Sequence, residues 1–84
     1  MPKIWIVQGS TGEDAAHQEW PVRAYRDEMK AQRLVVEAQA RACEMEASRP
    51  NRYSDPEGSN EFDPEMKMDY TGTQYTCYPV DLEE

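Results

Sequence analysis

One segment constrains the fold of this chain more than any other: residues 27–48 contain neither Gly nor Pro and are rich in Ala, Glu, Gln, Arg and Met. These residue types favour helix and Pro50 ends the pattern, so the segment predicts one long helix over residues 27–48. Its apolar side chains recur on one face at about 100° per residue, as in a helix that covers a single apolar surface. The members of this stripe are Ala31, Leu34, Val35, Ala38, Ala42 and Met45.

Three other segments have the patterns of strands. Residues 4–8 begin with an unbroken apolar run, which is typical of a central strand that is covered on both faces. Residues 20–25 alternate apolar and polar side chains, and Pro21 indicates an edge strand because proline cannot donate a ladder hydrogen bond. Residues 74–82 alternate in the same way and predict the last strand.

The order strand, strand, helix, strand predicts an α+β fold of ββαβ topology. The first two strands form a hairpin, and the helix crosses back so that the last strand pairs beside the first. We therefore expect a three-stranded antiparallel sheet of order 2-1-3 with the long helix on one face. The chain has 84 residues and is expected to form a single domain, residues 1–84, in which residues 49–69 are a long acidic loop.

One helix covers only one face of such a sheet, so the other face is expected to be bare and partly hydrophobic. Exposed apolar area usually marks an interface, and a homodimer is the natural expectation. Strand parity puts Tyr75 and Cys77 on this bare face, together with Trp5, as the dimer interface. A thiol there could form an intermolecular disulfide, although a reduced cysteine packed as a small apolar residue is favoured.

Composition also indicates the cellular compartment in which the protein acts. No apolar run reaches the roughly 18 residues that span a bilayer, and the N-terminus has no signal-peptide pattern. Two cysteines are too few for a disulfide scaffold, which favours a reducing, cytoplasmic environment. No membrane partner is expected.

Charge is distributed unevenly along the chain. The net charge is −8, and residues 53–84 carry all of it, with nine acidic residues against Lys67 alone. A chain this acidic repels DNA, RNA and anionic lipid, so it is not expected to bind nucleic acid directly. The asymmetry instead indicates an electrostatic partner, or a solvated face that keeps the protein soluble.

The signatures of catalysis and metal binding are weak. Residues 9–12 read GSTG after a strand, but no lysine follows as a phosphate loop requires. The acidic loop does not fit an EF-hand, because Asn60 and Met66 occupy the positions of the required Gly and Glu. His17 is the only histidine and two cysteines do not complete a zinc site. We therefore expect a protein that is not an enzyme and that uses no cofactor and no metal.

Three stretches of the chain resemble a known group of proteins. They are WIVQGSTGE at residues 5–13, WPVRAYRDE at residues 20–28 and MDYTGT at residues 68–73. Together they resemble small proteins encoded by phages and prophages of proteobacteria, a group that includes an anti-CRISPR protein directed at the type I-C Cascade surveillance complex. The resemblance implies an inhibitor that acts in the host bacterial cytoplasm, binds a basic surface on a Cascade backbone subunit and stops target DNA from loading.

The candidate partner-binding residues come from charge alone, since the resemblance carries no known site residue. A dense carboxylate patch can occupy a groove lined by Lys and Arg, in competition with nucleic acid. The carboxylates expected to form this patch are Glu57, Glu61, Asp63, Glu65 and Asp69, joined by Glu13 and Asp14. The alternative is a phage accessory or structural protein, a dimeric protein-interaction module in which the charge is only solubilising.

Overall fold

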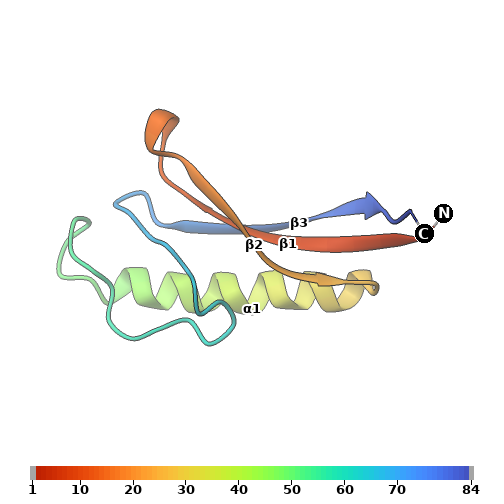
Figure 1. The fold of residues 1–84 in the computed structure, drawn as a ribbon. Helices are drawn as coiled ribbons and strands as arrows, with labels where there is room; N and C mark the ends of the chain where they lie inside the picture. Colours follow the sequence, from red (N-terminus) through yellow and green to blue (C-terminus); the bar gives the residue numbers. More distant parts are fainter. Residues whose placement is uncertain (1, 84) are drawn as a thin grey trace.

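A three-stranded antiparallel sheet lies against one long helix in the computed structural model, which describes residues 2–83 (Figure 1). The elements follow in the order β1 (Lys3–Thr11), a 3-10 turn η1 (Asp14–Ala16), β2 (Gln18–Tyr25), α1 (Glu28–Ala47) and β3 (Thr73–Asp81). The strand order is β2-β1-β3, with both pairings antiparallel. The α+β class, the topology and the sheet order predicted from the sequence are therefore confirmed.

The helix α1, together with its two cap residues, covers the predicted range 27–48. Asp27 is the N-cap, and its carboxylate accepts a hydrogen bond from the backbone N–H of Met29 at 2.9 Å. Ser48 is the C-cap, two residues before Pro50. The predicted stripe faces the sheet and the loop: all of its members are buried except Val35, which is half-buried.

The face of the sheet that packs on α1 carries the odd-numbered residues of β1 and β3. Val7 is fully buried with Ala31 and Leu34, and the half-buried Trp5 and Cys77 pack against this cluster. Tyr75 is only 5% exposed and packs against Ala38 and Ala42. The predicted dimer interface of Trp5, Tyr75 and Cys77 is therefore wrong, because these side chains point into the core.

Register explains this error. β1 pairs with β3 without interruption, so Val7 lies opposite Cys77 and Gly9 lies opposite Tyr75. Directly opposite residues share a face, and the helix covers Val7. Both faces of β3 carry apolar side chains, so alternation alone could not show which face is covered.

The uncovered face carries the even-numbered residues, and it is apolar at the end of the sheet where the two chain termini lie (Figure 1). Ile4 lies opposite Val80, and Ile6 lies opposite Tyr78. Tyr78 and Val80 are 42% and 40% exposed. The prediction of a bare, partly hydrophobic face therefore holds, with a different set of residues.

The free edge of β3 is partly closed by a side chain of the helix. The Gln39 amide donates to the carbonyl of Thr73 at 2.9 Å, and its oxygen accepts from the N–H of Tyr75 at 2.9 Å. A glutamine thus makes the two hydrogen bonds that a neighbouring strand would make. Further along the same edge Pro79 has no N–H to donate. Both features oppose the addition of another strand to this edge.

Candidate functional site

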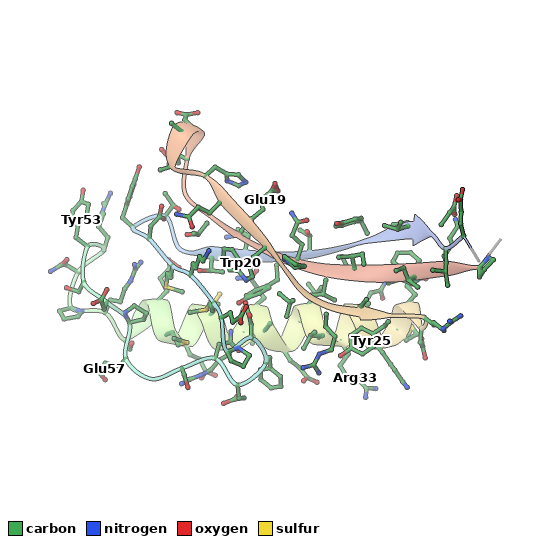
Figure 2. The ribbon with its side chains drawn as sticks, viewed as in Figure 1. Glu19, Trp20, Tyr25, Arg33, Tyr53 and Glu57 are labelled. Atoms are coloured by element: carbon green, nitrogen blue, oxygen red, sulfur yellow. The ribbon has the colours of Figure 1, made fainter. Side chains whose placement is uncertain are left out.

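The long loop between α1 and β3 presents four exposed carboxylates. Asp55, Glu57, Glu61 and Glu65 are all exposed, and none of them forms an ion pair with another residue of 2–83. Figure 2 shows Glu57 on the outer side of the loop, near the C-terminal end of α1. Three of the predicted partner-binding residues (Glu57, Glu61 and Glu65) are therefore available at the surface.

This loop is tied firmly to the helix and the sheet. The Asn60 side chain donates to the carbonyl of Ala38 at 3.2 Å, and the Arg41 side chain donates to the carbonyl of Ser59 at 3.0 Å. Phe62 packs against both buried clusters. The exposed carboxylates consequently stand on an anchored segment, so a partner has little backbone freedom to remove when it binds.

Asp63 is 3% exposed and does not belong to the exposed patch. Its Oδ2 accepts one hydrogen bond from the indole Nε1 of Trp20 and another from the hydroxyl of Tyr75, each at 2.8 Å. Burial raises the pKa of the Tyr75 hydroxyl, and its hydrogen bond to Asp63 raises it further. This carboxylate joins the loop to β2 and β3, which corrects its predicted role as a surface residue.

Asp69 is half-buried and also has a structural role, at the turn before β3. Its Oδ1 accepts from the N–H of Thr71 at 2.8 Å and from the Thr11 hydroxyl at 3.1 Å. The hydrogen bonds from Thr71 lower the pKa of this carboxyl below its ordinary value. The side chain holds the end of β1 to the start of β3. The prediction that Asp69 is a free surface charge is therefore wrong.

Glu13 and Asp14 are exposed at the β1–β2 connector, which stands away from the helix in Figure 1 while the loop lies beside it. Glu13 accepts a hydrogen bond from the Tyr70 hydroxyl at 3.3 Å, and the Tyr70 ring lies 5.9 Å from that of Tyr53. These contacts join the connector to Tyr70, near the end of the loop. The carboxylates of Glu13 and Asp14 nevertheless lie apart from those of residues 57–65, so the predicted patch is divided into two groups.

Cations collect at the other end of the molecule, which the sequence analysis did not anticipate. Arg23, Arg26, Lys30 and Arg33 lie where β2 ends and α1 begins, and they form no ion pair within residues 2–83. The exposed carboxylates of Asp27 and Glu28 lie in the same stretch of the chain. Figure 2 shows Arg33 near Tyr25, at the end of α1 farther from Glu57. The first half of the chain has balanced charge, and this balance concealed the cluster. Near the C-terminal end of α1, by contrast, two arginines form ion pairs, Arg41 with Glu44 at 3.2 Å and Arg49 with Glu46 at 3.9 Å.

An open cavity of about 300 Å³ lies beneath the acidic loop. Its lining combines three methionines, Met45, Met66 and Met68, with the polar residues Asp55, Asn60 and Asp63. No group of three or more His, Cys, Asp or Glu side chains in the described part of the chain is arranged to hold a metal ion. Across the same residues, no helix has the length and apolar character needed to cross a membrane.

A comparison with known proteins found no match: no family model, no curated protein and no solved structure matches this chain.

Proposed function

We propose that this protein is a non-enzymatic inhibitor that places the exposed carboxylates of its long loop on a basic, nucleic-acid-binding surface of a partner protein. The observation that carries the proposal is that Glu57, Glu61 and Glu65 are exposed, unpaired within residues 2–83 and mounted on an anchored loop. In a surface that binds nucleic acid, Lys and Arg are left without phosphates when the site is empty. Carboxylates held in a fixed arrangement satisfy these cations and compete with DNA.

The resemblance of three stretches to phage-encoded proteins supports a specific partner. It favours a backbone subunit of the type I-C Cascade complex, in the cytoplasm of a bacterial host, and a block of target DNA loading.

The test is inhibition of DNA binding by purified type I-C Cascade, measured by fluorescence anisotropy of a labelled target duplex. The protein should abolish the anisotropy rise, and inhibition should weaken steeply as salt is added. The variant Glu57→Lys/Glu61→Lys should lose inhibition. The control Glu28→Lys/Glu37→Lys changes the net charge equally on α1 and should keep it. Equal inhibition by both variants would remove the proposal.

A second candidate function, a dimeric protein-interaction module, is favoured by the uncovered face of the sheet. Ile4, Ile6, Tyr78 and Val80 form an apolar surface there, and Gln39 and Pro79 oppose association through the β3 edge. Two copies packed through this face would bury it. Sedimentation equilibrium should then show a dimer that Ile6→Glu converts to a monomer, with little dependence on salt. A monomeric wild-type protein would exclude this candidate.

A further inference from the structure

The cavity beneath the acidic loop has an unusual wall. Met45 comes from the last turns of α1, while Met66 and Met68 come from the end of the loop. Methionine side chains are flexible and polarisable, so they adapt to the shape of an aliphatic chain. The lining also includes two carboxylates, those of the buried Asp63 and the exposed Asp55. A volume of about 300 Å³ is at the lower end of the range for ligand pockets.

Asp63 lines this cavity, and one of its carboxylate oxygens retains unused hydrogen-bonding capacity. Both of its hydrogen bonds, from Trp20 and Tyr75, reach Oδ2, and no group of residues 2–83 donates to Oδ1. Asp63 also forms no ion pair within residues 2–83. The Lys67 ammonium lies 5.9 Å from the centroid of the Trp20 ring. A carboxylate that is almost fully buried without a cation is costly, unless a ligand brings one.

We propose that this cavity binds a guanidinium or ammonium group on an aliphatic stem, supplied by an Arg or Lys side chain of the protein partner. The cationic head bonds Oδ1 of Asp63 with Asp55 nearby, and the stem lies along the three methionines. The identity of the donor as a partner side chain rests on the proposed function, while the ligand chemistry rests on the cavity alone. The exposed loop carboxylates attract a basic surface, and the cavity fixes one of its side chains.

The experiment uses n-butylguanidinium as a probe, titrated into the isotope-labelled protein and followed by amide chemical shifts. Shifts should saturate at Asn60, Asp63 and Met66, while neutral n-butylurea should produce none. Asp63→Asn keeps an acceptor for Trp20 and Tyr75 but removes the charge, and it should weaken probe binding by at least about tenfold. The matched control Glu61→Gln removes a charge from the same loop outside the cavity and should leave binding unchanged.

A second variant keeps the proposal testable if Asp63→Asn does not fold. Ser59 is exposed and lines the cavity, so Ser59→Trp should occlude the cavity while leaving Asp63 in place, and should also abolish probe binding. Binding of butylurea as strong as that of butylguanidinium, or full binding by a folded Asp63→Asn or Ser59→Trp protein, would overturn the proposal.

The outcome is separable from that of the proposed function. Ser59→Trp could lose probe binding and still inhibit Cascade fully. That result would show that the cavity binds small free cations, and it would overturn the claim that a side chain of the partner occupies it. Probe binding by a wild-type protein that does not inhibit Cascade would remove the proposed function and leave the cation site standing.

Discussion

The hydrogen bond between the Tyr75 hydroxyl and Asp63 should contribute a large share of the stability of this small domain. Tyr75 is 5% exposed and Asp63 is 3% exposed, and the O–H···O distance is 2.8 Å. Tyr75→Phe keeps the ring that packs on Ala38 and Ala42 but takes one of two donors from a buried carboxylate. Hydrogen bonds to charged groups typically contribute about 1.5–3 kcal/mol, so we expect a loss of about 2 kcal/mol.

Urea denaturation followed by tryptophan fluorescence measures this loss, and a thermal melt should show a decrease in Tm of about 8–16 °C. The matched control is Tyr78→Phe, the same chemical change on the uncovered face of the sheet, where the side chain is 42% exposed. It should change the free energy of unfolding by less than about 0.5 kcal/mol. A Tyr75→Phe variant as stable as this control would refute the view that Asp63 is held by this bond.

Three further predictions concern the sheet and its turn. Gln39→Ala should cost about 1–2 kcal/mol by removing two hydrogen bonds, and light scattering should detect self-association through the freed β3 edge. Gly9→Ala should destabilise by about 1–3 kcal/mol in urea denaturation, because the added Cβ would lie 2.7 Å from the Trp20 ring. Asp69 has a pKa below its ordinary 3.8, so its ionised form stabilises the fold above about pH 4, and this stabilisation disappears as the pH falls through the lowered value. Asp69→Asn should therefore be less stable at neutral pH, with a flatter acid-unfolding curve below pH 4 than the wild type.

Local sequence signals were enough to predict the elements and their order. The uninterrupted helix formers of residues 27–48 and the proline at position 50 are local features of the sequence, so they indicate the helix without knowledge of the fold. The connection rules for a hairpin followed by a crossing helix then leave few arrangements, and the order β2-β1-β3 follows. The position of Glu57, Glu61 and Glu65 at the surface was also predictable, since charged loop residues without partners remain in water.

Long-range pairing decided the rest. Asp63 looks like any other acid of the loop, and only its approach to Trp20 and Tyr75, distant in sequence, turns it into a buried acceptor. The role of Gln39 likewise depends on α1 lying beside β3. The sequence alone therefore determined which segments are helix and strand and where the excess charge lies. Tertiary structure alone decided which face of β3 is covered and which carboxylates stay exposed, because register and burial arise from contacts between residues that are far apart along the chain.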